Sequence, residues 1–197
     1  MSKLPLVEDF YTLQGEGFHA GQAVWFIRLG GCDAGCAWCD AKFTWDAGRF
    51  HLVEAEEIAA RTSAARAVVV TGGEPLRYPL GPLTDELHAR GKEVYLETAG
   101  TYPLSGSFDW ICLSPKRRRP PLDEIWARAD ELKVIVAELD DLAWAEQCAA
   151  RVATDCLLYL QPEWGRMNDI TPAIVEYIKA NPRWRISLQI HKFMDIP

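Results

Sequence analysis

The sequence predicts an α/β fold in which an incomplete, laterally open (β/α)6-type barrel forms a single domain over residues 1–197. Short apolar runs, typical of strands buried on both faces, alternate along the chain with amphipathic segments of helical period. This alternation indicates a parallel sheet with right-handed crossovers. At 197 residues the chain has room for about six such repeats, fewer than a complete eight-stranded barrel of ~250 residues needs.

The expected strands are runs rich in β-branched and aromatic residues at 24–29, 67–71, 93–98, 110–113, 132–136, 156–161 and 184–190. The expected helices lie between them at 54–65, 80–90, 142–152 and 171–180. Thr171 followed by Pro172 predicts an N-cap and a first helical turn, and Asp140 is a candidate cap for the preceding helix. The basic and proline-rich break at 117–121 leaves room only for a short helix before the strand at 132–136.

Composition excludes several classes of protein. A net charge of −7 disfavours non-specific binding to nucleic acid, which needs a basic face. No apolar run approaches the ~20 residues of a membrane span, and the first residues lack the pattern of a signal peptide. Three of the six cysteines crowd one loop while Cys112, Cys148 and Cys156 stand apart, which favours a reduced, cytoplasmic setting over a disulfide framework.

The crowded loop carries Cys32, Cys36 and Cys39 in a C-x3-C-x2-C spacing, directly after the first expected strand. Three thiolates without a fourth leave one corner of a metal centre open, where a small molecule can coordinate. The glycines around them, Gly31 and Gly35 among these, permit tight wrapping of the backbone. The spacing favours a cubane iron–sulfur cluster over two alternatives: three thiols that only pack, and a zinc knuckle completed by a distant histidine.

Other polar motifs follow the remaining strands at the same end of the predicted barrel. TGGEP at 71–75 follows the second expected strand, ETAGT at 97–101 the third, SPK at 114–116 the fourth and QPE at 161–163 the sixth. Ligands of parallel α/β folds gather at the carboxyl ends of the strands. We therefore expect these motifs to surround one site together with the cysteine loop.

The C-x3-C-x2-C loop resembles that of the radical S-adenosylmethionine (SAM) enzymes, whose three cysteines hold a [4Fe–4S] cluster while SAM chelates the fourth iron. TLQGEG at 12–17, TGGEP at 71–75 and HKF at 191–193 before the final Pro197 narrow the resemblance to the 7-carboxy-7-deazaguanine synthase family, from about residue 7 to the end. The resemblance implies the open radical SAM barrel. It also implies radical ring contraction of 6-carboxy-5,6,7,8-tetrahydropterin to 7-carboxy-7-deazaguanine with loss of ammonia, SAM being used catalytically, in queuosine and 7-deazapurine biosynthesis.

The resemblance also implies a set of site residues, with Cys32, Cys36 and Cys39 as cluster ligands. Contact with SAM is implied for Trp38, Cys39, Asp40, Gly73, Ser114, Pro115, Lys116, Gln161, Pro162, Glu163 and Trp164. Contact with substrate is implied for Leu13, Gln14, Gly15, Arg28, Thr71 and the free carboxylate of Pro197. No side chain is assigned a catalytic role, because the SAM-derived radical carries the chemistry, and His51, His88 and His191 are taken as surface or packing residues.

Each assignment has a plainer alternative. Trp38 could be a hydrophobic lid over the cluster, Arg28 a structural ion pair, and Pro197 a frayed terminus. TGGEP at 71–75 could be a plain strand-to-turn connection, and the motifs at 114–116 and 161–164 could be turns that owe their prolines only to backbone geometry. Glu74, within TGGEP, is expected to offer an acceptor near a charged amine.

One position departs from the family pattern. Activity in the family usually depends on Mg2+, and a hydroxyl residue after the Cys–Asp pair typically ligates the ion, but here that position is Ala41. Alanine offers no ligand atom, so substrate, water and Asp40 would have to hold the ion. We expect a magnesium requirement that is retained but loosened.

The expected partners are a small pterin substrate and a flavodoxin or ferredoxin as reductant, with neither nucleic acid nor membrane. Arg117, Arg118 and Arg119 form a basic run that is either a solvated loop or a docking point for an acidic electron donor. A homodimer is expected by analogy. Two other functions compete: another radical SAM enzyme, such as a glycyl-radical activase, and a non-catalytic iron–sulfur electron carrier.

Overall fold

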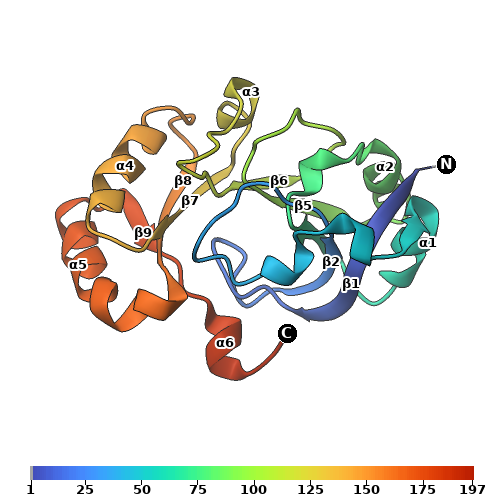
Figure 1. The fold of residues 1–197 in the computed structure, drawn as a ribbon, viewed down its shortest axis with the longest axis horizontal. Helices are drawn as coiled ribbons and strands as arrows, with labels where there is room; N and C mark the ends of the chain where they lie inside the picture. The colour runs from blue at the N-terminus through green and yellow to red at the C-terminus, as the bar shows by residue number, and fades with distance from the viewer. Residues whose placement is uncertain (1) are drawn as a thin grey trace.

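A single twisted sheet runs through the computed structural model, which describes residues 2–197 (Figure 1). Its strands lie in the order β3-β1-β2-β4-β5-β6-β7-β8-β9. All neighbours from β2 to β9 are parallel, whereas β1 pairs with β2 and with β3 in antiparallel fashion. The strand bounds are β1 Lys3–Leu13, β2 Ala23–Leu29, β3 Leu52–Glu54, β4 Ala67–Gly72, β5 Glu93–Thr98, β6 Trp110–Leu113, β7 Glu131–Val136, β8 Leu157–Pro162 and β9 Trp184–Ile186.

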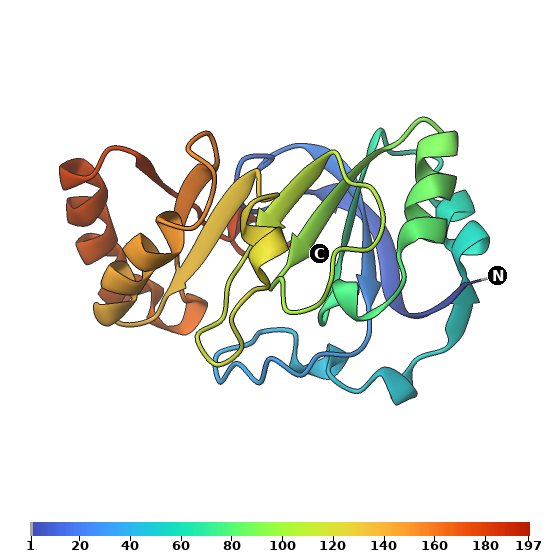
Figure 2. The same ribbon diagram turned by 90° about the horizontal axis from the view of Figure 1, so that it is seen from above.

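All helices except the last cover the outer side of this sheet, as the two views in Figures 1 and 2 show. Their bounds are α1 Ala55–Arg61, α2 Gly81–Ala89, α3 Asp123–Trp126, α4 Asp140–Ala149, α5 Met167–Ala180 and α6 Ile190–Met194, with 3₁₀ turns η1 Lys42–Thr44, η2 Ala47–Arg49, η3 Pro75–Arg77 and η4 Trp164–Arg166. Among residues 2–197, no helix has the length and apolar character needed to cross a membrane.

The predicted open barrel is confirmed. The parallel strands follow one another in chain order, and within the described residues the two edge strands β3 and β9 do not pair with each other. The sheet therefore forms an arc rather than a closed cylinder (Figure 1). The loops after β2 and β6 emerge at the same end of the arc, at the lower side of Figure 2.

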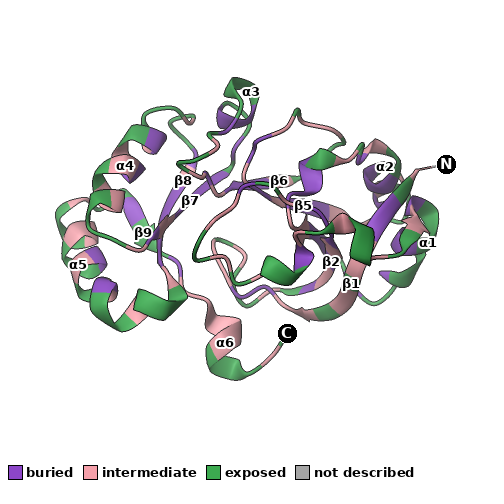
Figure 3. Ribbon diagram, viewed as in Figure 1, coloured by how far each residue is buried: buried purple, intermediate pink, exposed green. Residues whose placement is uncertain are grey.

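The main core lies between the outer face of the arc and its helices, and it contains strand residues such as Val70 and Leu96 together with Ile58, Leu83 and Ile174 from α1, α2 and α5. Each of these side chains is fully buried. Burial follows the strands and the inward faces of the helices, while the outer helix faces are exposed (Figure 3). Burial on both faces explains why the central strands read as continuous apolar runs.

The antiparallel edge formed by β1 and β3 was not predicted. Only Leu4 and Pro5 of the eleven residues of β1 are buried, so its sequence lacks the continuous apolar run of the central strands. Pro5 lies where β1 faces the edge strand β3, a place that tolerates a residue without an N–H.

Two predicted helix starts were wrong. α5 begins at Met167 rather than Thr171, so Pro172 lies inside the helix, and the Thr171 hydroxyl donates back to the Met167 carbonyl at 2.6 Å. The turn η4 immediately precedes α5 and starts it early. α4 begins at Asp140, and the carboxylate that accepts from the preceding backbone N–H groups, at 2.9 and 3.0 Å, belongs to Asp141.

The last expected strand, 184–190, is also shorter than predicted. β9 ends at Ile186, although the Ser187 N–H still donates to the Leu160 carbonyl of β8 at 2.9 Å. The Ser187 hydroxyl donates to Gln161 at 2.6 Å and accepts from the Gly17 N–H at 3.0 Å. The chain then crosses the mouth of the arc into α6.

Candidate active site

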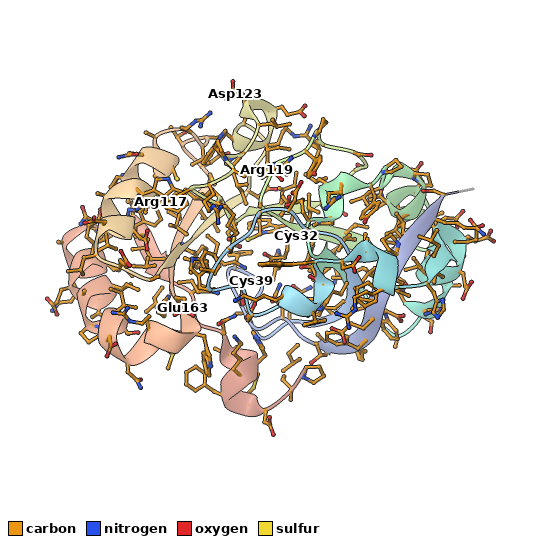
Figure 4. All side chains as sticks on the ribbon, viewed as in Figure 1. Cys32, Cys39, Arg117, Arg119, Asp123 and Glu163 are labelled. Atoms are coloured by element: carbon orange, nitrogen blue, oxygen red, sulfur yellow. The ribbon has the colours of Figure 1, made fainter. Side chains whose placement is uncertain are left out.

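A cavity of about 400 Å³ opens at the carboxyl ends of the parallel strands. The predicted residues that line it are Leu13, Gln14, Gly15, Arg28, Cys32, Cys36, Trp38, Cys39, Asp40, Thr71, Gly73, Ser114, Lys116, Gln161, Pro162, Glu163, Trp164 and Pro197. Figure 4 shows Cys32, Cys39 and Glu163 around the middle of the arc. The structure thus brings almost the whole predicted set together, and the individual roles stay predictions.

Pro115 is the exception among the predicted residues. It is buried and does not line the cavity, unlike its neighbours Ser114 and Lys116. Side chains alternate across an extended chain, so the residues on either side of Pro115 face the cavity while Pro115 faces the protein. A contact between its side chain and a ligand in the cavity is therefore not supported.

The cysteine loop is held in place by its backbone. The Gly31 N–H donates to the Thr44 carbonyl at 2.6 Å, and the Tyr78 hydroxyl donates to the Gly30 carbonyl at 2.8 Å. Gly31 has a φ of 99°, a conformation that residues with a Cβ rarely adopt. These contacts fix the path of the loop before the first cysteine, so Cys32 enters the cavity in a defined position.

The three thiols of this loop fit an iron–sulfur cluster better than a single metal ion. Cys32, Cys36 and Cys39 are free and half-buried on one cavity wall. Within residues 2–197, no three His, Cys, Asp or Glu side chains converge closely enough to hold one ion. In a cubane each thiolate ligates a different iron, so its ligands lie farther apart than those of a closed zinc site. The zinc-knuckle alternative therefore lacks its converging ligands.

Two cations lie near the thiol of Cys36. Burial raises the pKa of Cys36, while the charges of Lys116 and Arg118 oppose that rise. Burial also raises the pKa of Cys32, so this thiol is protonated at neutral pH. A metal cluster would displace these protons, because thiolates are its ligands.

The TGGEP loop packs directly on the cysteine loop. A Cβ at Gly73 would overlap the Gly31 carbonyl and the Cys32 side chain, so only glycine allows this approach. The Glu74 N–H donates to the same Gly31 carbonyl at 2.8 Å. The loop therefore places Gly73 on the cavity wall next to the first cysteine.

Glu74 does not offer its carboxylate to a ligand, contrary to the expectation. Its side chain is buried outside the cavity lining and accepts from the Thr98 hydroxyl at 2.6 Å and from the backbone N–H groups of Ala99 and Leu76 at 2.7 and 3.0 Å. Burial raises the pKa of Glu74 despite these hydrogen bonds. Glu74 therefore ties the end of β5 to the turn after β4.

A buried ion network forms the floor of the cavity. The Lys133 ammonium donates to Glu16 at 2.6 Å and to Glu97 at 2.9 Å. Burial alone would raise the pKa of Glu16, but the charge of Lys133 and hydrogen bonds from Lys133, Gln189 and Gln161 lower it to about 2. Burial raises the pKa of Glu97 although Lys133 opposes the rise. Glu16 is thus the firmly ionised partner of Lys133.

The predicted substrate-binding residues lie at the β1–β2 side. The Arg28 Nε donates to Glu8 at 2.7 Å, and Arg28 also lines the cavity, so its ion pair and a role toward a ligand are compatible. Gln14 is buried, and its side chain donates to Glu97 at 3.4 Å. A Cβ at Gly15 would overlap the imidazole of His191, which packs there and lines the cavity.

The opposite wall is formed by Trp38 and Lys116. The Lys116 ammonium lies 5.0 Å from the centre of the Trp38 ring and donates to the Ser114 hydroxyl at 2.7 Å. Burial lowers the pKa of Lys116. Trp38 remains partly exposed, so its ring can cover a ligand in the cavity or act as the lid considered above.

The C-terminal segment closes the cavity from the open side of the arc. The Lys192 ammonium of α6 donates to Asp40 at 2.7 Å, and the Ile190 N–H donates to the Gly15 carbonyl at 3.0 Å. The Thr12 hydroxyl donates to a terminal oxygen of Pro197 at 3.3 Å. This segment therefore links the cysteine loop to the end of β1.

Several cavity residues were not predicted, above all the charged or amide side chains Glu16, Glu97, Lys133, Gln189 and Lys192. Glu16 and Lys192 belong to the motifs TLQGEG and HKF, and Glu97 is the first residue of ETAGT. The motifs therefore predicted the location of these residues but not their roles. Lys133 interrupts an apolar strand with a charge, which is a signal of a functional or paired lysine.

An open arc of parallel strands with three free thiols beside a cavity at the strand ends is the arrangement expected of a radical SAM enzyme. No family model matches the chain. It is 48% identical over 195 residues to 7-carboxy-7-deazaguanine synthase from Flavobacterium psychrophilum, covering 98% of this chain and 93% of the relative. The enzyme of the same name from Escherichia coli is 34% identical, with 98% of both chains covered. The chain belongs to the 7-carboxy-7-deazaguanine synthase family.

The fold agrees with this membership. The crystal structure of QueE from Escherichia coli matches with a TM-score of 0.84 at 33% identity, covering 94% of this chain and 93% of that one. Named relatives that match over nearly the full length of the chain argue against the glycyl-radical activase and electron-carrier alternatives.

Proposed function

We propose that this chain converts 6-carboxy-5,6,7,8-tetrahydropterin to 7-carboxy-7-deazaguanine with loss of ammonia, for queuosine and other 7-deazapurines. The observation that carries the proposal is the placement of Cys32, Cys36 and Cys39 on one wall of a cavity that opens at the strand ends. These cysteines would hold a [4Fe–4S] cluster, which when reduced supplies the electron for the cleavage of bound SAM that starts the reaction. The protein contributes placement, charge and the exclusion of water.

The proposed site divides between the two ligands. Trp38, Gly73 and Lys116 would border SAM next to the cluster, where Gly73 presents backbone at close range and Trp38 presents a ring face. On the other side, the guanidinium of Arg28 would face the substrate carboxylate, and Gln14 would read the polar edge of the pterin. Pro197 also lines the cavity and would border the pterin on this side.

Anaerobic reconstitution tests this function directly. We expect the reconstituted protein, given SAM, a reductant and 6-carboxy-5,6,7,8-tetrahydropterin, to form 7-carboxy-7-deazaguanine, detected by mass. Iron and sulfide analysis should give a four-iron cluster, and Cys36→Ala should lose it. Stoichiometric zinc in the anaerobically purified chain would contradict the proposal.

We further propose that an acidic flavodoxin or ferredoxin docks on the loop at 117–119, next to the cysteine loop. Arg118 donates to the Gly35 carbonyl at 3.3 Å, and Arg119 pairs with Asp33. Arg117 instead pairs with Asp141 at 2.8 Å and is partly neutralised. Charge reversal of Arg118 should slow reduction by such a donor at low salt but not reduction by dithionite; unchanged kinetics with both reductants would exclude docking there. The homodimer and the cytoplasmic location remain predictions.

A further inference from the structure

The position of Ala41 raises the question of which cation faces the substrate beside the cysteine loop. Ala41 lines the cavity without a ligand atom. Its neighbour Asp40 is already occupied, because one carboxylate oxygen accepts from the Lys192 ammonium at 2.7 Å and from the Gln189 amide at 3.1 Å. A divalent ion approaching this carboxylate would meet a positive charge at hydrogen-bond distance.

The donor set around this position does not fit Mg2+. Magnesium needs oxygen ligands in a near-octahedral arrangement. It usually takes one or two of these from the protein and the rest from substrate and water. Beside the cysteine loop, the position that would add a hydroxyl is Ala41, and the Asp40 carboxylate is already bound by Lys192 and Gln189. Of the other carboxylates that line the cavity, Glu16 and Glu97 are both bound to Lys133, and Glu16 also accepts from the Gln189 amide at 2.8 Å. Glu163 accepts from the Gly165 N–H at 3.0 Å.

The ammonium of Lys192, by contrast, is fixed on the cavity wall. It donates to the Gln189 side-chain oxygen at 2.9 Å in addition to Asp40, and it lies 4.9 Å from the centre of the Trp164 ring. Two of its three N–H donors are used in this way, which leaves a donor for a bound molecule. α6 keeps Lys192 in place through the backbone contact of Ile190 with Gly15.

We propose that Lys192 takes the place of the divalent cation in this chain, donating to the carboxylate of the pterin, and that the chain binds its substrate without magnesium. The inference rests on the proposed function. It replaces the retained but loosened magnesium requirement expected from the sequence with no requirement at all. An ammonium supplies positive charge and hydrogen bonds to an anionic oxygen, which is what a carboxylate needs in a partly buried site.

Ligand affinity measured with and without magnesium tests the proposal. The probe is 6-carboxypterin, an oxidised analogue of the substrate, titrated anaerobically into the reconstituted enzyme in excess EDTA and again in millimolar Mg2+. For the natural sequence we expect the two Kd values to agree within about twofold. For Lys192→Met in EDTA we expect Kd to rise roughly tenfold to a hundredfold, as for loss of a charge-assisted hydrogen bond.

Two further variants separate charge from structure. Lys179→Met makes the same charge change on the exposed face of α5, where Lys179 pairs with Glu176, and should leave Kd unchanged. The double variant Ala41→Thr with Lys192→Met restores a hydroxyl and removes the ammonium, so magnesium should tighten its binding about tenfold or more. A loss of α6 packing alone would not produce that rescue.

The outcomes distinguish this inference from the function on which it rests. If magnesium tightens the binding of 6-carboxypterin to the natural sequence as much as to the double variant, the role of Lys192 is wrong. The role is also wrong if Lys192→Met and Lys179→Met lose the same affinity for 6-carboxypterin. Turnover of the tetrahydropterin is measured in parallel. Product formed only with magnesium defeats the inference and leaves the function standing, whereas no product in either condition defeats the function.

Discussion

Lys133 sets the charge balance of the cavity floor. It is almost completely buried on β7 between two carboxylates. Burial alone would lower the pKa of Lys133, but nearby negative groups, Glu16 and Glu97 among them, hold it well above its usual value. A buried lysine that stays charged gives the site a fixed positive point, and it makes the ionisation of Glu16 part of the stability of the fold.

Acid should therefore destabilise the chain partly through Glu16. Its pKa is about 2 in the folded state against an ordinary value of 4.5. A lowered pKa stabilises the fold above the unfolded value, and that contribution is lost as pH falls from about 4.5 toward 2, amounting to about 3 kcal/mol. We expect Glu16→Gln to flatten the decline of the unfolding free energy over this range in urea titrations. An identical decline in both proteins would contradict the assignment.

Glu74 should matter for stability rather than for ligand binding, although the sequence motif TGGEP suggested a ligand contact. Its two carboxylate oxygens accept three hydrogen bonds from within the protein. In Glu74→Gln an amide N–H₂ must face a backbone N–H or the Thr98 hydroxyl, so we expect a loss of roughly 1–3 kcal/mol by denaturant unfolding. Glu56→Gln, at an exposed position on α1, is the matched control and should be neutral. Equal stabilities of the two variants would contradict this.

At the level of elements, the pairing of β2 with β4 positions the cysteine loop. Gly72, at the end of β4, has a φ of 140°, and a Cβ there would overlap the backbone of Leu29 on β2. The cysteine loop begins immediately after Leu29. A change that separates these two strands should therefore disturb both stability and the position of the cluster ligands.

We expect substitution by alanine to destabilise the fold strongly at Gly72 and only weakly at Gly91, a glycine that also has a positive φ. Gly91 has a φ of 70° with open space around it, so Gly91→Ala should lower stability by only about 1 kcal/mol. Gly72→Ala adds a backbone clash to its strain and should lose about 3 kcal/mol or more, with reduced iron content after reconstitution. Thermal unfolding and iron analysis check this, and similar Tm shifts for the two variants would argue against a tight β2–β4 contact.

The same elements show what the sequence could and could not reveal. β4, β5 and β7 are buried on both faces, so their apolar runs were visible and their ends were close to the predicted ones. β1 is half exposed, and its position at the sheet is set by pairing with β2, a contact between distant residues that leaves no local pattern. The early start of α5 depends on the preceding turn rather than on Thr171 and Pro172.

For the molecule as a whole, the sequence located the site but not its internal charges. The end-of-strand position of the motifs followed from the parallel alternation alone. The ion network did not, because Glu16 and Lys133 are 117 residues apart and meet only through the curvature of the sheet. The contact between Asp40 and Lys192, 152 residues apart, likewise appears only when the C-terminal segment crosses the mouth of the arc.

Because the C-terminal segment lies across the cavity without adding to the core, we expect its removal to affect ligand binding much more than stability. α6 contributes no buried side chain, so removing residues 190–197 should change the unfolding free energy by only about 1 kcal/mol. The same truncation removes Lys192, His191 and Pro197 from the cavity wall. We expect the affinity for 6-carboxypterin to fall about a hundredfold while Tm stays nearly constant.

A point variant in the same helix provides the control for this truncation. Met194 is exposed on α6 and does not line the cavity, so Met194→Ala should keep both affinity and stability. Calorimetric Tm and anaerobic ligand titration of the three proteins give the comparison. A truncated chain that still binds the pterin as tightly as the full chain would mean that the closing segment is a cover without ligand contacts. A large fall in Tm would instead show that α6 contributes substantially to the stability of the fold, although none of its side chains is buried.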